Sequence, residues 1–396
     1  CYNLYAGREP MKELTKYKLN ATIRYFGDAF FYPFFALYLI NSGLTEAKIG
    51  FILSITPIVA IIVNPIYSHI CQDVKITRKV LRVITIVEAL IILAISFSKN
   101  FYLISGLVVL LAIFGSSHYG LLDSLTAIYA SETKINYTNI RIFGSIAYII
   151  ATTLGGFVIQ YLGFQFCFAI ACTAFILSGI LYQFLKPIEL NEEEQKKEKP
   201  RYQVLLKNKK YVFYALFYVI MIGTTVSGEA FFPTYLESRG ITSDQYGLIY
   251  SYFVLFEVVT IIILNKYFKK ANYHVLLAIY TILTTIRLLV NYLYLPVSIV
   301  VLFSAFRGIA NAVVLFGGFH YIIKLVGEKS VTKAFMLMVL MQSIYVAIFN
   351  NINGNIIEKY SYKTFYFITM MISLFTMTLA ILRLFYYRKK EKEAIS

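Results

Sequence analysis

Residues 35–52, FALYLINSGLTEAKIGFI, align without a gap to residues 232–249, FPTYLESRGITSDQYGLI. Just upstream, the sequence GDAFF at 27–31 is echoed by GEAFF at 228–232. The offset of 197 is close to half of the 396 residues. This spacing indicates that the chain is an internal duplication. The identities within the first stretch lie at Phe35, Tyr38, Leu39, Gly43, Thr45, Gly50 and Ile52.

The composition is that of an integral membrane protein. Hydrophobic residues make up 59% of the chain and charged residues only 15%, whereas a soluble domain is about half apolar and about a quarter charged. An α-helix needs about 20 apolar residues to cross the hydrocarbon. Runs of that kind lie near 19–40, 49–70, 80–98, 101–130, 142–162, 164–185, 211–236, 246–265, 273–294, 296–323, 334–353 and 364–387.

These runs predict an all-α integral membrane protein with twelve transmembrane helices in two six-helix, pseudo-symmetric bundles. Parallel repeats of this kind place a shared binding site near mid-membrane and alternate access by rocking around it. The long polar connection KPIELNEEEQKKEKPRYQVLLKNKK, at 186–210, separates the bundles. The predicted parts are an N-terminal segment (1–16), a first bundle (17–187), a linker (188–210), a second bundle (211–387) and a tail (388–396).

Lysine and arginine are concentrated in alternate connections, which predicts the orientation because basic residues are retained on the cytoplasmic side. Both termini and the linker are predicted to be cytoplasmic, in a multi-pass protein of the bacterial cell membrane. The net charge of +16 then faces anionic lipid, and no nucleic acid partner is expected. Cysteines and histidines lack metal-ligand spacing, so no metal or other cofactor is predicted.

Ionisable residues inside the apolar runs predict a polar path through the membrane. Each costs at least ~2.5 kcal/mol at mid-bilayer, so groups of both signs are expected to face one another or water. Asp123 lies toward the end of one run. Those deep inside the runs are Arg24, Asp28, Glu229, Glu257, Arg287 and Arg307.

Arg24 and Asp28 are four residues apart, so they share one helical face and are expected to form an ion pair. That pair either neutralises both charges for insertion or releases Asp28 to take a proton. Glu229 and Glu257 have no basic neighbour one turn away, and an isolated buried carboxyl has a raised pKa. They are therefore predicted to couple transport to protons, or else to form static salt bridges with Arg287.

Polar residues at helical spacing indicate where a solute binds. Arg307 precedes Asn311 by four residues, and an arginine presents a planar fork of donors suited to carboxylates or vicinal hydroxyls. In the salt-bridge alternative for Glu229 and Glu257, Arg307 is the other possible partner besides Arg287. Tyr119 precedes Asp123 by four residues, which places a ring and a carboxylate on one stripe.

These features resemble the major facilitator superfamily, over residues 17–387. The start of the chain and the spacing of Asp123 and Arg141, eighteen residues apart with Arg141 ahead of Phe143-Gly144, resemble the branch with lactose permease and its nucleoside and phenylpropionate permease relatives. The resemblance implies that Asp123 and Arg141 hold solute hydroxyls and that Tyr148 stacks on the solute. A monomer is implied as well.

Two features depart from that branch. Ala310 stands where the sugar permease has its proton-releasing glutamate, so that proton route is absent here. The cytoplasmic signature after the second span is also degenerate, with Ser68 and Gln72-Asp73 followed by Lys75. Glu257 and the twenty-residue spacing of Arg287 and Arg307 are similar to charged positions that line the permease cavity.

The sequence therefore predicts a proton-coupled symporter of a small neutral solute such as an oligosaccharide, glycoside or nucleoside. The alternative is a proton-coupled multidrug efflux antiporter of the same fold. An enzyme would need a clustered nucleophile or metal motif, which the sequence lacks. A sensor or purely structural protein would tolerate neutralisation of both Glu229 and Glu257.

Overall fold

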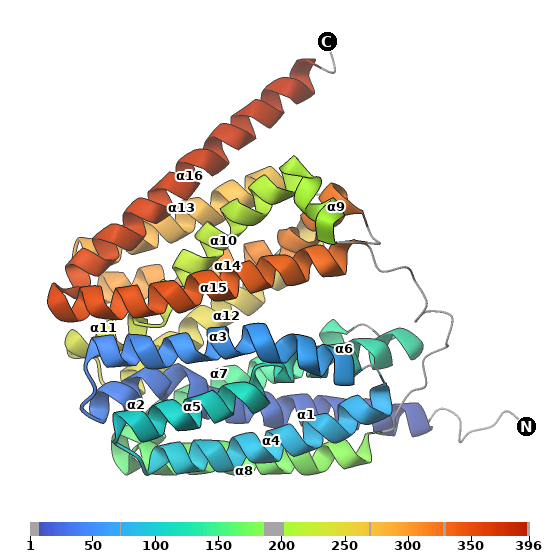
Figure 1. Cartoon of the computed structure of the whole chain (residues 1–396), viewed down its shortest axis with the longest axis vertical. Helices are drawn as coiled ribbons and strands as arrows, with labels where there is room; N and C mark the ends of the chain where they lie inside the picture. The colour runs from blue at the N-terminus through green and yellow to red at the C-terminus, as the bar shows by residue number, and fades with distance from the viewer. Residues whose placement is uncertain are drawn as a thin grey trace, which may run out of the picture. The chain divides into compact units, whose positions relative to one another are not determined.

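The computed structural model describes residues 8–71, 73–135, 137–185, 202–268, 271–327 and 330–393 (Figure 1). Within these ranges the secondary structure is helical, which confirms the predicted all-α class. The helices are α1 (Arg8–Phe31), η1 (Tyr32–Phe34), α2 (Phe35–Asn41), α3 (Glu46–Ile70), α4 (Val74–Ser96), α5 (Phe101–Gly115), α6 (His118–Glu132), α7 (Thr138–Leu162), α8 (Phe164–Leu181), η2 (Tyr182–Phe184), α9 (Tyr202–Lys207), α10 (Lys209–Glu229), α11 (Phe232–Ser238), α12 (Ser243–Tyr267), α13 (Tyr273–Tyr292), α14 (Val297–Val326), α15 (Val331–Lys359) and α16 (Tyr362–Glu393).

Ten spans among the described helices are long and apolar enough to cross a membrane. They coincide with ten of the predicted runs. The other two runs, 19–40 and 80–98, fall on α1 with α2 and on α4, where charged side chains lower the hydropathy. These include Arg24 and Asp28 on α1 and Glu88 on α4. The count of twelve spans and the two-bundle symmetry stay predictions.

The sequence repeat is matched by local structure at the same offset. Helix α11 begins and ends 197 residues after α2, and α12 begins and ends 197 residues after α3. Each short helix is followed by a glycine of positive φ, +81° at Gly43 and +83° at Gly240, a conformation that glycine adopts without steric cost. The duplicated residues therefore form the same helix-turn-helix twice.

Tertiary contacts divide the chain into two compact units. Unit 1 takes in 1–44, 55–197 and 236–251, and unit 2 takes in 45–54, 198–235 and 252–396. The first turns of α3 thus belong to unit 2 and those of α12 to unit 1. Of the predicted linker, 188–201 lies outside the described residues, as do residues 1–7 and 394–396 at the two ends.

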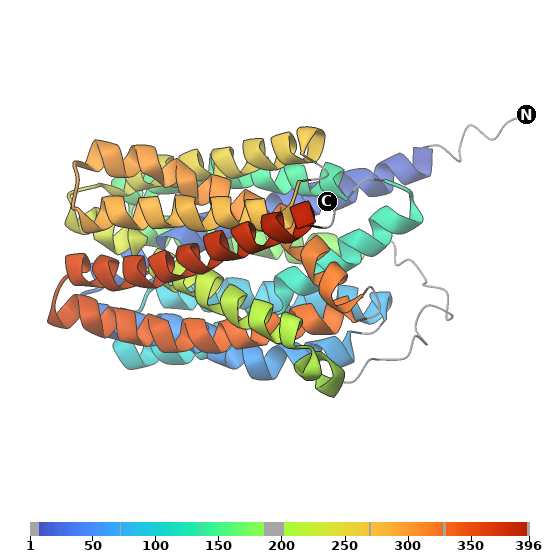
Figure 2. The ribbon, with the colours of Figure 1, turned by 90° about the horizontal axis from the view of Figure 1, so that it is seen from above.

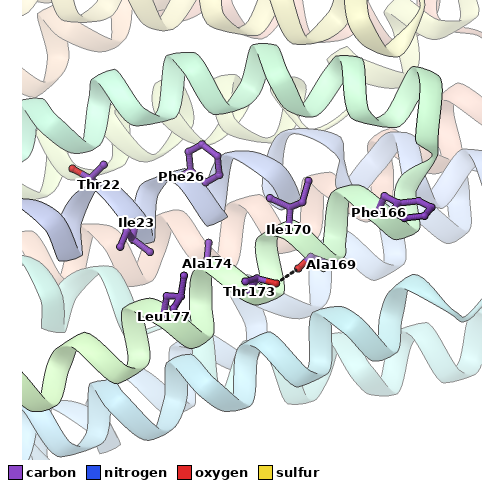
Figure 3. Close-up of a pocket in the computed structure, with 9 residues that line it drawn as sticks. All are labelled: Thr22, Ile23, Phe26, Phe166, Ala169, Ile170, Thr173, Ala174 and Leu177. Carbon is purple, nitrogen blue, oxygen red and sulfur yellow. Dashed lines mark hydrogen bonds between the residues drawn. The ribbon is translucent and has the colours of Figure 1, made fainter.

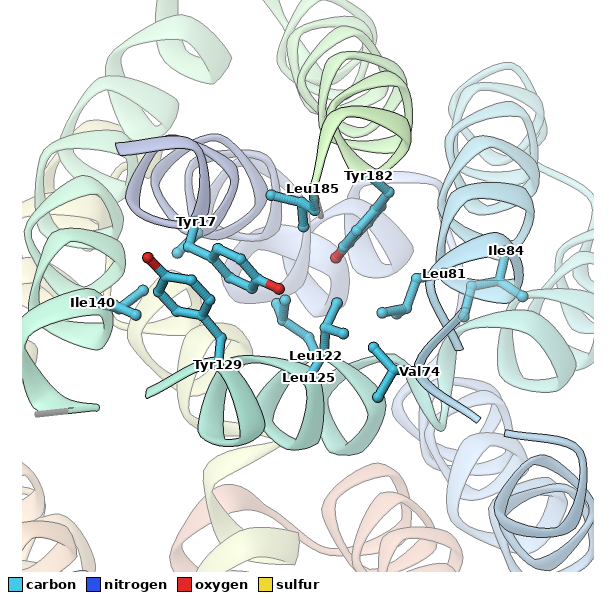
Figure 4. Close-up of a cluster of buried hydrophobic side chains, with 11 residues drawn as sticks. Tyr17, Val74, Leu81, Ile84, Leu122, Leu125, Tyr129, Ile140, Tyr182 and Leu185 are labelled. Atoms are coloured by element: carbon cyan, nitrogen blue, oxygen red, sulfur yellow. The ribbon is translucent and has the colours of Figure 1, made fainter. Parts of the chain in front are cut away.

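In unit 1, α1 packs along α7 and α8, and α4 packs against α5, α6 and α8. One apolar cluster joins α1, α4, α6, the start of α7, and the segment of η2 and Leu185 that follows α8 (Figure 4). Within it the rings of Tyr17 and Tyr129 are stacked, with centroids 4.1 Å apart. Leu81, Leu122 and Tyr182 are almost completely buried beside them. This packing fixes the three helices that carry the buried charges described below.

In unit 2, α13 lies along α14 and α16, and α10 lies along α15 (Figures 1 and 2). Helices α12 and α14 approach closely at Gly308, where an added Cβ would lie 2.8 Å from the backbone nitrogen of Glu257. Only glycine leaves room for two backbones at this distance. The contact places Arg307 of α14 over the ring of Phe253 on α12.

Candidate functional site

The first charged cluster of unit 1 starts from an ion pair on α1. Arg24 Nη2 lies 3.0 Å from Asp28 Oδ1, and Arg24 Nε donates to Asp28 Oδ2 at 3.2 Å. Both side chains have no exposed surface. Because the residues are one helical turn apart, the two-point geometry follows from helix spacing. The guanidinium also lies over the ring of Phe175, 4.0 Å from its centroid.

A second carboxylate shares the same guanidinium. Arg24 Nη1 donates to Glu88 Oε2, which comes from α4. Glu88 is also completely buried. One cation therefore faces two carboxylates in a site without water-exposed side chains. A buried pair that is left partly uncompensated is strongly unfavourable.

His118 does not supply the missing positive charge. Thr85 Oγ1 donates its proton to the Leu81 carbonyl at 2.6 Å, so His118 Nδ1, 3.2 Å away, is the donor to Thr85. The other ring nitrogen, Nε2, lies 3.2 Å from the Tyr182 hydroxyl, which can donate to it. Both nitrogens are thus satisfied in the neutral imidazole. The distance from Nδ1 to Glu88 Oε2 is 3.8 Å, too long for a hydrogen bond.

The fourth predicted span is interrupted beside Glu88. Helix α5 ends at Gly115 and α6 begins at His118, and the hydroxyls of Ser116 and Ser117 both donate to Asn64 Oδ1, at 3.1 and 2.7 Å. A Cβ on Gly115 would lie 2.6 Å from Glu88 Oε1. Glycine at this break therefore makes room for the carboxyl group.

A second, more open cluster in unit 1 joins Asp123, Tyr137 and Arg141. The Tyr137 hydroxyl donates to Asp123 Oδ1 at 2.6 Å and accepts from Arg141 Nη1 at 3.3 Å. Arg141 Nη1 lies 3.8 Å from Asp123 Oδ2. Burial raises the pKa of Tyr137, so its hydroxyl stays protonated and keeps its donor role. The side chains of Asp123 and Arg141 are 40% and 48% exposed, so both can still bind a ligand.

The two tyrosines predicted to bind solute lie closer to the first cluster. Tyr119 has its ring 5.9 Å from the Arg24 guanidinium, and Tyr148 has its hydroxyl 3.5 Å from that of Tyr250. Both phenols are near enough to Asp28 to interact with it electrostatically. Neither has a described contact with Asp123.

In unit 2, Glu229 of α10 lies between two arginines. Arg287 of α13 forms an ion pair with Glu229 Oε1, and Arg307 Nε lies 3.0 Å from Glu229 Oε2. Glu229 is 11% exposed and Arg287 only 5%. The structure therefore pairs Glu229 with both Arg287 and Arg307, the two partners that the sequence named for it.

Glu257 is joined to the same network through α14. Asn311 Nδ2 donates to Glu257 Oε2 at 3.5 Å, and the Arg307 guanidinium lies 4.0 Å from the ring centroid of Phe253, one turn before Glu257. Asn291, one turn after Arg287 on α13, is completely buried. Two arginines and two glutamates thus balance each other in this part of unit 2.

A groove between α1 and α8 has a volume of about 480 Å³ (Figure 3). It is lined by Thr22, Ile23, Phe26, Phe166, Ala169, Ile170, Thr173, Ala174 and Leu177. The Thr173 hydroxyl donates to the Ala169 carbonyl at 2.9 Å. A site that orients a small solute needs convergent polar groups, which this lining lacks. Among the described residues, no group of His, Cys, Asp and Glu is placed to hold a metal ion.

Sequence reasoning missed Glu88 and Tyr137. Glu88 stands alone in the apolar run 80–98, which is the same signal that singled out Glu229 and Glu257. Tyr137 lies just before its predicted span, at 142–162, so a search confined to apolar runs passes over it. Its position at the start of α7, one turn before Arg141, is the feature that links it to the pair.

The fold and these charged clusters are those of a multi-span membrane protein with buried ion pairs. The profile of the MFS_1 like family matches residues 25–366, and the chain belongs to that family. The predicted membership of the major facilitator superfamily is thereby confirmed, and the protein is a transporter rather than an enzyme.

Individual relatives agree with this assignment. The chain is 26% identical over 232 residues to the uncharacterized transporter YwbF of Bacillus subtilis (strain 168), a match that spans 57% of each chain. It is 22% identical over 267 residues to the probable 3-phenylpropionic acid transporter of Escherichia coli (strain K12), covering 66% of this chain and 70% of the relative. A maltose permease of Geobacillus stearothermophilus is 25% identical over 42% of this chain and 43% of its own.

Solved structures share the fold at low sequence identity. The nucleoside transporter NupG superposes with a TM-score of 0.77 at 13% identity, covering 93% of this chain and 98% of that one. A bacterial homolog of the human lysosomal transporter Spinster gives a TM-score of 0.72 at 11% identity, covering 94% and 95%. These likenesses describe the architecture alone.

Proposed function

We propose that the protein is a proton-coupled symporter that carries a small neutral, hydroxylated solute by alternating access. The observation that supports this most directly is the half-exposed Asp123–Tyr137–Arg141 cluster. A carboxylate accepts hydrogen bonds from solute hydroxyls, and a guanidinium donates to them as a planar fork. Because both side chains keep part of their surface free, the cluster can exchange its internal contacts for contacts with a solute.

Charge balance supports a neutral solute. Asp123 and Arg141 offset each other in unit 1, and Glu229 with Glu257 offsets Arg287 and Arg307 in unit 2. A charged solute would leave such a balanced set with an uncompensated charge, which is costly in a low-dielectric site. We assign Asn311 to solute contacts as well, because its amide donates to Glu257. Tyr119 and Tyr148 are assigned to solute contacts because each phenol lies near the Arg24–Asp28 pair.

The solutes for which relatives are named are compatible with this class. Maltose and nucleosides, named for the permease and for NupG, are neutral and rich in hydroxyls. Phenylpropionic acid, named for the Escherichia coli relative, carries a carboxylate instead. The balanced charges favour the neutral class for this chain.

Proton coupling is assigned to the buried charges Arg24, Asp28, Glu229, Glu257 and Arg287. The two carboxylates of α1 and α10 are each held by arginine, so protonation of either would release its partner to move. The protein is proposed to work as a monomer in the lipid bilayer of a bacterial cell membrane. Both termini are proposed to lie on the cytoplasmic face.

Uptake by purified protein in liposomes tests the proposal. The probes are radiolabelled uridine, maltose and phenyl β-glucoside, each with and without an inside-alkaline pH gradient. At least one probe is expected to accumulate only with the gradient. Asp123→Asn should raise its half-saturation concentration about tenfold, the effect of losing about 1.4 kcal/mol of binding. Glu132→Gln, an exposed change on the same helix, is the matched control and should behave as wild type.

The efflux alternative predicts a different result in the same liposomes. Ethidium and tetraphenylphosphonium would then move against the proton flux, and uridine, maltose and the glucoside would not move at all. That outcome would replace symport of a neutral solute by antiport of hydrophobic cations. Movement of no probe under any gradient, by protein shown to be folded, would contradict both proposals.

A further inference from the structure

We infer that Glu88 is the proton-holding group of unit 1, with the proton on its Oε1 atom. The inference rests on the proposed symport and deepens it, because it assigns the coupling proton to a residue of α4 that is not among the residues proposed above for proton coupling. It starts from the completely buried cluster of Arg24, Asp28 and Glu88.

The charges in this cluster do not balance without a proton. Arg24 carries one positive charge, and its two partners carry one negative charge each when ionised. The neutral tautomer of His118 satisfies both of its ring nitrogens. A charged imidazole would be a second cation without exposed surface next to Arg24, which is unfavourable, so His118 is counted as neutral. An unpaired charge transferred out of water is so unfavourable that a buried group neutralises instead. One proton shared by the two carboxyls removes the excess.

The contacts assign that proton to Glu88 rather than to Asp28. Both Asp28 oxygens face Arg24, at 3.0 and 3.2 Å, which favours the ionised carboxylate. Only Oε2 of Glu88 meets the guanidinium. Asp28 Oδ1 and Glu88 Oε1 are both buried without a hydrogen-bond partner among the described residues, but Oδ1 keeps its 3.0 Å ion-pair contact with Arg24. Glu88 Oε1 has no such contact among the described residues, so it is the oxygen on which a proton disrupts favourable charge pairing least.

The other groups that face Glu88 from neighbouring elements do not change the charge balance of the Arg24, Asp28 and Glu88 cluster. The tyrosines among them are neutral near pH 7 at their ordinary pKa of about 10. The titratable and charged groups around the carboxyl are Arg24, Asp28, Tyr32, Tyr67, His118, Tyr119 and Tyr182.

The break between α5 and α6 provides a way to release the proton. Gly115 and the two serines that follow it lie against Glu88 and Asn64. A change at this break that admits water to Oε1 would let Glu88 ionise and compete with Asp28 for Arg24. Proton release and rearrangement of the ion pair on α1 would then be one event, which is what coupling requires.

Infrared difference spectroscopy of the purified full-length protein tests the assignment. The wild type at pH 7 should show a protonated carboxyl C=O band that shifts in D₂O. Glu88→Gln should lower this band by one carboxyl group, and Glu132→Gln should leave it unchanged. A band of unchanged intensity in Glu88→Gln would overturn the inference.

A second measurement keeps the native side chains, in case Glu88→Gln does not fold. Labelling wild-type protein with [¹³C-carboxyl]glutamate should shift the band, because the protonated group is a glutamate. A band that stays at its unlabelled position would place the proton on an aspartate and would also overturn the inference.

Transport assays distinguish failure of the Glu88 assignment from failure of the proposed symport. Glu88→Gln mimics the protonated state, so it should exchange uridine, maltose or phenyl β-glucoside across the membrane but fail to accumulate any of them on a pH gradient. Equal accumulation by Glu88→Gln and wild type would overturn the role of Glu88 while the symport proposal stands. A wild type that shows the band but no gradient-driven uptake would instead contradict symport itself.

Discussion

Arg24 and Asp28 are joined by two contacts on one face of α1, at 3.0 and 3.2 Å, with no exposed surface on either side chain. Their spacing is local, but their environment is not, because Glu88 reaches the same guanidinium from α4. Arg24 is therefore the cation on which two buried carboxyl groups depend.

Replacing Arg24 should be among the most destabilising changes in unit 1. Arg24→Gln leaves two buried acids without a cation, a loss expected to cost about 3–5 kcal/mol. Arg141→Gln, at a half-exposed ion pair, should cost about 1 kcal/mol or less. Denaturant unfolding of both variants in detergent measures the difference. Equal losses would show that Arg24 is not the main compensating charge.

Gly115 should be intolerant of even one methyl group. A Cβ there would lie 2.6 Å from Glu88 Oε1, so Gly115→Ala must displace the carboxyl, at a cost of about 1–3 kcal/mol for overpacking. Gly106 is the matched control on the same helix, since no described atom lies within 4 Å of the position that its Cβ would take. Gly106→Ala should therefore leave the unfolding temperature at or above that of wild type. Matching losses in the two variants would contradict this packing.

Tyr137 should matter for solute affinity more than for stability. Tyr137→Phe removes the hydroxyl that donates to Asp123 and accepts from Arg141. Since these partners are exposed to solvent, water can replace the lost contacts and the free energy of unfolding should change by about 1 kcal/mol or less. The half-saturation concentration for uptake should rise several-fold. An unchanged value would argue that solute does not bind at this cluster.

The sequence predicts those features of the molecule that depend on local spacing. The repeat at offset 197 recurs in the bounds of α2 and α11, and the four-residue spacing of Arg24 and Asp28 appears as a bidentate pair. Helix periodicity determines which residues share a face, so such relations can be read along one segment.

Relations between helices could not be read in this way. Periodicity does not say which neighbouring helix a face will meet, and Glu88 reaches Arg24 from 64 residues along the chain. The partner of Glu229 was left open for the same reason, and the structure gives it both Arg287 and Arg307. Charge counts over a single run therefore miss the imbalance that appears only when α1 and α4 pack together.

Gly308 should control the separation of α12 and α14. A Cβ on Gly308 would clash with the Phe253 carbonyl oxygen and lie 2.8 Å from the Glu257 nitrogen. Gly308→Ala must push α14 from α12, lowering stability by about 1–3 kcal/mol and weakening uptake. Gly318→Ala is the matched control on α14, since nothing described lies within 4 Å of its Cβ position. Wild-type stability in Gly308→Ala would show that α12 and α14 can move apart at little cost in free energy.

Glu229 should show strong coupling to Arg287 in a double-mutant cycle. Glu229→Gln leaves Arg287 and Arg307 close to one uncharged amide, an expected loss of about 3–5 kcal/mol for a broken buried pair. Adding Arg287→Gln removes one of the two cations, so the double variant should lose less than the sum of its single variants. Residues within one salt-bridge network show interaction energies of about 0.5–3 kcal/mol.

Glu237→Gln, in α11 and outside this network, provides the comparison, because pairing it with Arg287→Gln should give additive losses. Denaturant unfolding of the five variants in one detergent completes the cycle. Additive losses for Glu229→Gln and Arg287→Gln would mean that the ion pair contributes no net stability. Glu229 could then exchange partners at little cost, as its proposed role in proton coupling requires.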